Sequence, residues 1–206
     1  MIIALTFLAA LIVASFLEYA VHRLMHAGLV LVAKHAEHHK DGWGQGFWPE
    51  LRDYVVPGLP VTLPSWLLGT EVGVGWTSGF ATFAVFVAYA HQLQHDNPVA
   101  CRWMRIPVHY VHHRDQMWHH NFGLSTDLWD RLLGTYRVVP FGEEFTPEQR
   151  RRGPLDIRWY RVRAADLEAS GVSATCSDQL DLALSSSWIH DPAARAASSS
   201  FAPRAS

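Results

Sequence analysis

The sequence predicts an all-α integral membrane protein, a helical bundle with a histidine-rich helical cap. Three uncharged hydrophobic segments, residues 1–17, 54–70 and 72–90, predict the membrane part. Thirteen histidines among 206 residues, most of them at helical spacing, predict the cap. The net charge of −2 argues against a protein that binds nucleic acid, which would carry a basic surplus.

The first hydrophobic segment, residues 1–17, is predicted to cross the membrane. A span needs about 20 apolar residues, and about 17 is the lower limit. A secretory signal peptide is the alternative, but it would carry basic residues before its apolar stretch. No Lys or Arg precedes Arg23, and helical sequence continues without a break to His26. We therefore favour a membrane helix.

Residues 54–70 and 72–90 predict a membrane hairpin with its turn at Glu71. Prolines in the first of these segments are tolerated if neighbouring groups satisfy the carbonyls that the prolines free. A re-entrant course for 54–70 is the alternative. The three prolines are Pro57, Pro60 and Pro64.

One span followed by a hairpin places residues 18–53 and 91–141 on the same side of the membrane. The basic residues of both stretches then share that side, and none lies at the predicted turn. By the positive-inside rule this side is cytoplasmic. These basic residues are Arg23, Lys34, Lys40, Arg52, Arg102, Arg105 and Arg114.

Ten histidines form four boxes at helical spacing: HRLMH, HAEHH, HQLQH and HYVHH. Residues three and four positions apart lie on one face of a helix, so each pair or trio of imidazoles converges. The ten are His22, His26, His35, His38, His39, His91, His95, His109, His112 and His113.

This concentration of imidazoles predicts metal ligands. Ten are too many for one ion, which takes about four to six ligands, and suit two ions. Cys101 and Cys176 lie far apart with no CxxC spacing, and HExxH is absent. We therefore expect the cytoplasmic cap to hold a di-metal site of iron, zinc or copper, with redox chemistry favouring iron. Core or interfacial histidines, a metal-buffering tract and a cytochrome with axial histidines are the alternatives.

Residues beside the boxes are candidates for supporting roles. Glu18 lies one turn before His22 and is expected either to orient that imidazole or to be a plain interfacial carboxylate. His119 and His120 are adjacent, so at most one of them faces the metals easily. We place both, with Asn121, at the edge of the substrate site or in hydrogen bonds around the ligands.

The four boxes, with NFG at 121–123 and LWDRLLGT at 128–135, resemble the fatty acid hydroxylase superfamily, the integral-membrane sterol desaturase and lipid hydroxylase group. The resemblance covers about residues 14–138. It implies two iron ions held by the ten boxed histidines, with zinc as a possible substitute in purified protein. It also implies that the protein uses O2 to hydroxylate or desaturate an unactivated C–H bond of a lipid drawn from the bilayer.

The sequence departs from the family pattern at two points. The family commonly has two spans before the first box, whereas this chain has one, which leaves the substrate tunnel less enclosed or calls for a homo-oligomer. No fused haem or iron–sulfur module is evident, so the resemblance implies an external electron donor, a ferredoxin or a small cytochrome with its reductase. A carotenoid ring hydroxylase is the alternative enzyme. A non-catalytic histidine-rich metal-binding or transport protein is the alternative of another class.

The chain divides into three regions by composition. We expect residues 1–141 to form the membrane domain, with an aromatic and glycine-rich loop over 42–49 at the headgroup level. Residues 142–184 are expected to form a loosely packed cytoplasmic appendage. Residues 185–206, rich in Ala, Ser and Pro, are expected to be disordered, and the lone His190 has no assigned role.

Overall fold

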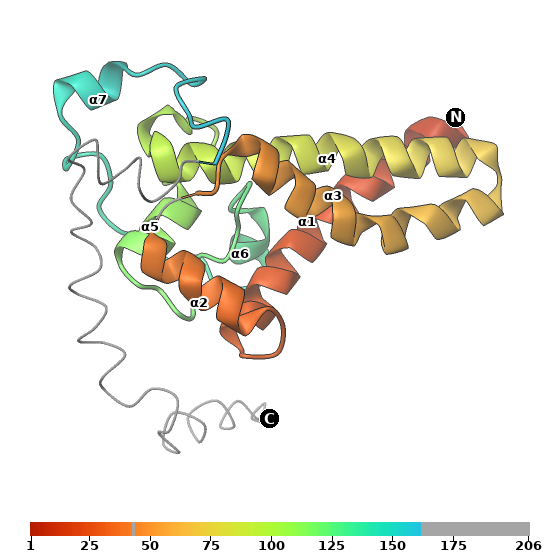
Figure 1. Ribbon diagram of the computed structural model, residues 1–206, viewed down its shortest axis with the longest axis horizontal. Helices are drawn as coiled ribbons and strands as arrows, with labels where there is room; N and C mark the ends of the chain where they lie inside the picture. Colours follow the sequence, from red (N-terminus) through yellow and green to blue (C-terminus); the bar gives the residue numbers. More distant parts are fainter. Residues whose placement is uncertain (43, 162–206) are drawn as a thin grey trace, which may run out of the picture.

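The computed structural model of the chain describes residues 1–42 and 44–161, which form helices and loops with no strand among them. Two long helices, α1 (Ile2–His26) and α4 (Thr70–Asp96), extend as an arm from a cap of shorter helices (Figure 1). The other elements are α2 (Val32–Asp41), α3 (Phe47–Thr62), η1 (Leu63–Leu68), η2 (Pro98–Ala100), α5 (Val108–Arg114), α6 (Leu128–Leu132) and α7 (Pro147–Arg151).

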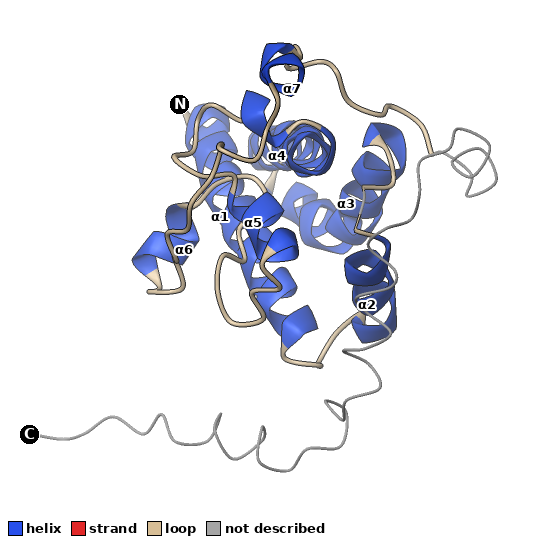
Figure 2. Ribbon diagram, turned by 90° about the vertical axis from the view of Figure 1, so that its left-hand side faces the viewer, coloured by secondary structure: helices blue, strands red, loops and turns tan. Residues whose placement is uncertain are grey.

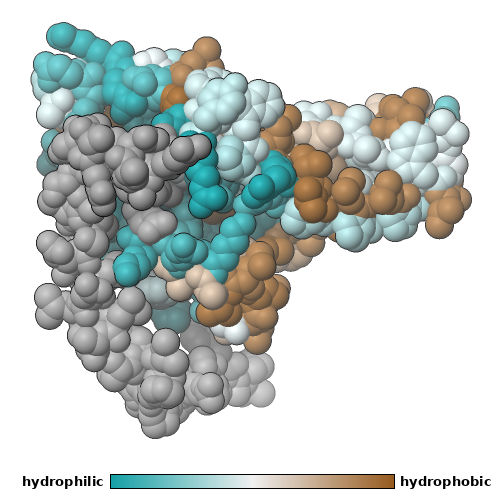
Figure 3. Space-filling view, viewed as in Figure 1, coloured by the Kyte–Doolittle hydropathy of each residue, from teal (hydrophilic) through white to brown (hydrophobic). Residues whose placement is uncertain are grey.

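The arm has the properties of a membrane-spanning part. Of the helices in the described residues, α1 and α4 are long and apolar enough to cross a membrane. Large apolar side chains of α1 remain exposed on its outer face, among them Leu5, Leu8 and Ile12. Hydrophobic and neutral residues cover the arm, whereas hydrophilic residues gather over the cap (Figure 3). Exposed apolar side chains of this kind are suited to contact with the hydrocarbon chains of lipids.

Glycines allow α1 and α4 to pack closely. A Cβ atom at Gly75 would lie 1.9 Å from the Thr6 hydroxyl, and one at Gly79 would lie 2.6 Å from the Phe7 carbonyl oxygen. This is the small-residue spacing by which membrane helices approach each other. Both helices run in the same direction (Figure 1), so their C-terminal ends carry histidines into the cap together.

The predicted second segment, residues 54–70, differs most from expectation. It is not one spanning helix: α3 begins earlier, at Phe47, contains Pro57 and Pro60, and gives way to η1. The turn lies at Gly69, which has a φ of 112°, and Glu71 belongs to the first turn of α4. The count of three spanning segments is therefore not confirmed. The early start of α3 also shortens the predicted headgroup loop.

The segment after residue 141 is packed more closely than expected, as far as residue 161. Ile157 is buried in the hydrophobic core of the cap. The backbone N–H groups of Phe47 and Trp48 donate to the carbonyls of Arg158 and Trp159, at 2.9 and 3.1 Å. The Arg158 guanidinium also pairs with Asp96 at the end of α4. Residues 142–161 therefore strap α3 to α4, while 162–206, with Cys176 and His190, lie outside the described residues.

Candidate metal centre

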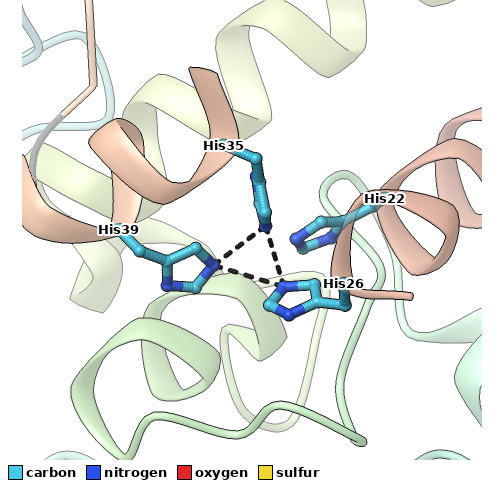
Figure 4. A group of neighbouring side chains, drawn as sticks. All are labelled: His22, His26, His35 and His39. Carbon is cyan, nitrogen blue, oxygen red and sulfur yellow. Dashed lines mark hydrogen bonds between the residues drawn. The ribbon is translucent and has the colours of Figure 1, made fainter. Parts of the chain in front are cut away.

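All ten boxed histidines lie together in the cap. The prediction that each box lies on a helix is confirmed: the boxes belong to α1, α2, α4 and α5. The imidazoles divide into two groups, each with ligand atoms from at least three helices. Figure 4 shows four members of the first group turned toward one another from α1 and α2.

The first histidine group contains His22, His26, His35, His39 and His112. The His26 Nε2 atom lies 2.8 Å from His35 Nε2 and 3.2 Å from His39 Nε2. His112 approaches from α5, with its Nε2 atom 2.9 Å from that of His26. Four of the five, all but His112, have ligand atoms within 4.8 Å of one another and can hold a metal ion.

The second histidine group contains His38, His91, His95, His109 and His113. The His95 Nε2 atom lies 3.2 Å from His91 Nε2 and 3.0 Å from His109 Nε2. The His113 ring lies beside these, with its centroid 4.7 Å from that of His38. The other four form a second set of ligand atoms within 4.8 Å of one another. The two groups adjoin, since the rings of His39 and His113 stack with centroids 4.1 Å apart.

The spacing of these nitrogens fits metal ligands. With metal–nitrogen distances of about 2.1 Å, neighbouring nitrogens lie about 3.0 Å apart in an octahedral site and about 3.4 Å apart in a tetrahedral one. A neutral imidazole has one N–H, so converging Nε2 atoms cannot all be satisfied by hydrogen bonds to one another. Buried Nε2 atoms of His22, His38 and His113 have no hydrogen-bond partner among the described residues. A cation within each group would satisfy such lone pairs.

Backbone carbonyls around the two histidine groups determine which ring nitrogen of His22 and of His112 carries the proton. His22 Nδ1 donates to the Phe122 carbonyl at 2.6 Å, and His112 Nδ1 donates to the His120 carbonyl at 2.8 Å. Their Nε2 atoms are thereby left as lone-pair donors to a metal, which is the usual arrangement around metal-bound histidine.

Glu50 is a residue of this site that the sequence analysis missed. Its carboxylate is buried, 3% exposed, and its Oε2 atom lies 2.9 Å from His91 Nδ1. A carboxylate in this position orients the imidazole and makes its other nitrogen a better ligand. Glu50 lies outside the boxes, on α3, so no local spacing connected it with His91.

The NFG loop is held in place by Asp130, a second residue that the sequence analysis did not single out. The Asp130 side chain is fully buried, and burial raises its pKa. It accepts hydrogen bonds from the backbone N–H groups of Phe122 and Gly123 and from the Thr135 hydroxyl, at 2.9, 2.7 and 2.6 Å. This clamp joins the NFG loop to the segment LWDRLLGT and positions the Phe122 carbonyl for His22.

The four supporting candidates take different places around the site. Glu18 lines the apolar pocket described below, and its carboxylate accepts hydrogen bonds from the Ser125 N–H at 3.2 Å and the Ser125 hydroxyl at 2.5 Å rather than from His22. Asn121 is buried and pairs with the backbone of Arg137, so it braces the loop rather than the ligands. His119 is exposed, and His120 contributes its carbonyl rather than its ring.

Burial keeps several histidines of the two groups neutral by lowering their pKa values. It lowers the pKa of His35 to about 4, with further lowering from the neighbouring His112 and His91, and it lowers the pKa of His112 to about 4. Burial likewise holds the pKa values of His38, His109 and His113 well below the usual range. Neutral imidazole is the form that binds metal, so the site is ready to bind at neutral pH.

An apolar pocket of about 450 Å³ leads from the arm to both histidine groups. It lies between α1, α3 and α4, and α1 and α3 both pack against α4. The pocket lining includes five histidines from the two groups: His22, His35, His38, His91 and His109. Exposed apolar side chains line its outer part, including Val21 of α1 and Val55 and Leu59 of α3. The pocket therefore reaches the apolar outer surface beside α1 and α3.

Comparison with known families identifies a match over most of the described residues. A model described as fatty acid hydroxylase matches residues 7–135, more than half of the chain. No curated protein and no solved structure matches the chain. The matched range contains all four histidine boxes, the NFG loop and the Asp130 clamp.

Proposed function

Because the chain belongs to the fatty acid hydroxylase family, we propose that it is a membrane-bound non-haem di-iron oxygenase that hydroxylates or desaturates a lipid with O2 and external electrons. The family assignment supports an oxidoreductase of the lipid hydroxylase or desaturase type in general. One observation carries the finer proposal. In each histidine group four members have ligand atoms within 4.8 Å of one another, and both groups line an apolar pocket that reaches the apolar outer surface beside α1 and α3.

Each histidine group would hold one iron ion. Bound iron would supply the binding and reduction of O2, chemistry that zinc cannot perform. The chain supplies neutral ligands, which bring no charge to offset the metals. The buried carboxylate of Glu50, in contact with His91, provides negative charge beside the second group. The Phe122 and His120 carbonyls hold the His22 and His112 rings in the orientation that directs Nε2 inward.

The pocket supplies the binding of substrate. Its lining is mostly apolar, with side chains such as Leu17, Phe83 and Val87, so it excludes water and receives a hydrocarbon chain or ring. A lipid entering between α1 and α3 would bring a C–H bond to the histidine groups without leaving the bilayer. The same placement puts the cap on the water side of the membrane, which we assign to the cytoplasm from the basic residues.

Lipid analysis of cells tests this function. Cells with the wild-type protein should contain a lipid that has gained one oxygen or lost two hydrogens, as measured by mass spectrometry, and cells with His38→Ala or His112→Ala should lack it. An oxygenated carotenoid would identify the ring-hydroxylase alternative. Metal bound by the purified protein without any change in lipids would support the metal-binding alternative. The same product from the wild type and both variants would contradict the proposal.

A further inference from the structure

The walls of the apolar pocket continue from the histidines into the arm. On α4, the lining residues recur every three or four positions back from His91, which places them on one face of the helix. On α3, the same spacing joins Tyr54, Gly58 and Thr62. Figure 2, viewed from the cap end, shows α1, α3 and α4 as neighbouring helices seen close to end-on. The lining residues on this face of α4 are Thr77, Phe80, Ala81, Ala84, Val87 and His91.

Contacts between α3 and α4 mark the two ends of the pocket. At the histidine end, the Glu50 carboxylate lies 2.9 Å from His91. At the other end, the Trp76 indole N–H donates to the Val61 carbonyl at 3.1 Å, and the neighbouring Thr77 is the lining residue of α4 farthest from the histidines. From Thr77 to His91 the helix rises about 21 Å, at about 1.5 Å per residue, so the pocket has about this length.

The pocket is too narrow for a fused ring system. Its volume of about 450 Å³, spread over about 21 Å, gives a mean cross-section of about 20 Å². An extended hydrocarbon chain, whose carbon atoms make contact with their neighbours at about 4 Å, needs a cross-section of about 16 Å². A fused ring system is about twice as wide as such a chain in one direction. The pocket therefore fits a single hydrocarbon chain.

The pocket has a polar end and an apolar end. Its charged lining residues all belong to the histidine end: Glu18, Lys34, Glu50 and Asp53. Glu50 contacts His91. Lys34, which directly precedes His35, forms an ion pair with Asp53. Along the arm the lining residues are uncharged. A lipid therefore places its polar group near the histidines and its hydrocarbon tail in the arm.

Gly58 keeps the pocket open about halfway along its length. A Cβ atom at Gly58 would meet nothing else in the described part of the chain within 4 Å, and Gly58 lies inside α3 without a positive φ. The helix therefore does not need glycine here. The contacts at the two ends of the pocket place Gly58 opposite Ala81 of α4, which is also small and also lines the pocket. A larger side chain at either position would enter the space that a chain occupies.

We propose that Gly58 and Ala81 are specificity-determining residues that let a single extended hydrocarbon chain pass between them, and that the end of the pocket near Thr77 limits the length of this chain. The inference rests on the proposed function, because it takes this pocket as the substrate site. An extended chain advances about 1.2 Å per bond, so about 17 bonds fit between the histidines and Thr77. Gly58 lies about 12 Å along α3 from Glu50, so a larger side chain there stops the chain after about 10 bonds.

Gly58→Leu tests the passage, with Val56→Phe as the matched control. Val56 lies on the same helix, is 56% exposed and is not among the residues that line the pocket, and both changes add four carbons. The probes are radiolabelled octanol and hexadecanol, linear alcohols with a neutral polar end, bound to the metal-free full-length protein in one detergent. We expect Gly58→Leu to bind hexadecanol about 10-fold or more weaker than the wild type does and octanol equally well. Val56→Phe should change neither.

Ala81→Leu tests the same passage from the opposite wall and leaves α3 unchanged. It should weaken the binding of hexadecanol and spare that of octanol, and it decides the question if Gly58→Leu does not fold. In cells, the oxidised lipid from either variant should carry a shorter hydrocarbon tail beyond the oxidised carbon than the wild-type product, as measured by fragmentation in the mass spectrometer.

Equal binding of hexadecanol by the wild type, Gly58→Leu and Ala81→Leu would overturn the proposal. So would equal weakening of octanol and hexadecanol, because the variants would then disturb the whole pocket rather than its length. A fused-ring sterol that displaces labelled hexadecanol as well as unlabelled hexadecanol does would overturn the choice of a single chain. Absence of any oxidised lipid from wild-type cells would contradict the proposed function, while binding of the two alcohols would still decide whether Gly58 and Ala81 limit chain length.

Discussion

The substitution Asp130→Asn tests the hydrogen bonds that hold the NFG loop without changing any histidine. In the wild type, both carboxylate oxygens of Asp130 accept hydrogen bonds in a fully buried place. Asparagine replaces one oxygen with an NH2 group, which would face the N–H of Phe122 or Gly123. The variant loses a charge-assisted hydrogen bond and leaves one buried N–H without an acceptor. Together these changes cost about 2 to 5 kcal/mol of folding free energy.

The clamp also supports metal binding, although Asp130 touches no metal ligand. The Phe122 carbonyl that accepts from His22 Nδ1 at 2.6 Å belongs to the loop that Asp130 holds. Loosening this acceptor should lower metal affinity roughly 10- to 100-fold, the usual effect of removing a partner of a metal-bound histidine.

Asp127→Asn is the control for this prediction. Asp127 lies three residues away and pairs at 2.8 Å with Arg131, whose side chain is 48% exposed. Such a surface pair contributes at most about 1 kcal/mol. Thermal unfolding in detergent and titration with ferrous iron measure the two effects. Equal stability and equal metal affinity of the two variants would refute the role of the clamp.

Two further predictions concern topology and pH. Single cysteines placed at Ala36 and Gln116 should be labelled by an impermeant reagent from the cytoplasmic side, and a cysteine placed at Thr70 should be labelled from the other side. Labelling of positions Ala36 and Gln116 from opposite sides would contradict the topology. Burial lowers the pKa of His35 and His112 to about 4, whereas histidines of an unfolded chain titrate near 6.5. The unfolded state then binds more protons between these values, so the metal-free protein should lose stability as the pH falls from 6.5 toward 4. Thermal unfolding across this range checks the sign, and constant or rising stability at low pH would show that these imidazoles are not buried in the neutral form.

The features that local spacing determines could be predicted from the sequence. Three- and four-residue spacing places His35, His38 and His39 on one side of α2 whatever the tertiary fold, and the box on α5 follows the same rule. The helix α1 could be predicted from the length and composition of its apolar stretch alone. The division into two groups of five could not be predicted, because neighbouring members of one box, such as His38 and His39, belong to different groups.

The contacts between distant segments could not be predicted. His91 meets Glu50 on α3, and Asp96 meets Arg158, 62 residues later, so no short motif announces either pair. The partner of Glu18 could not be predicted for the same reason: helical spacing placed this residue near His22, whereas its carboxylate accepts from Ser125, which follows the NFG loop and lies more than 100 residues away in sequence. The end of α3 at Thr62 could not be predicted either. It depends on Pro57 and Pro60, and the helices packed around these prolines decide whether they interrupt the helix.

Metal content per chain tests the central claim most directly. Protein purified, stripped and reloaded anaerobically with ferrous iron should hold about two irons per chain by elemental analysis. His26→Ala, in the first group, and His95→Ala, in the second, should each hold about one or fewer, while His119→Ala, on the exposed loop, should keep most of both. A wild type with no bound iron, or His26→Ala and His95→Ala with two irons each, would contradict the assignment of one metal to each histidine group.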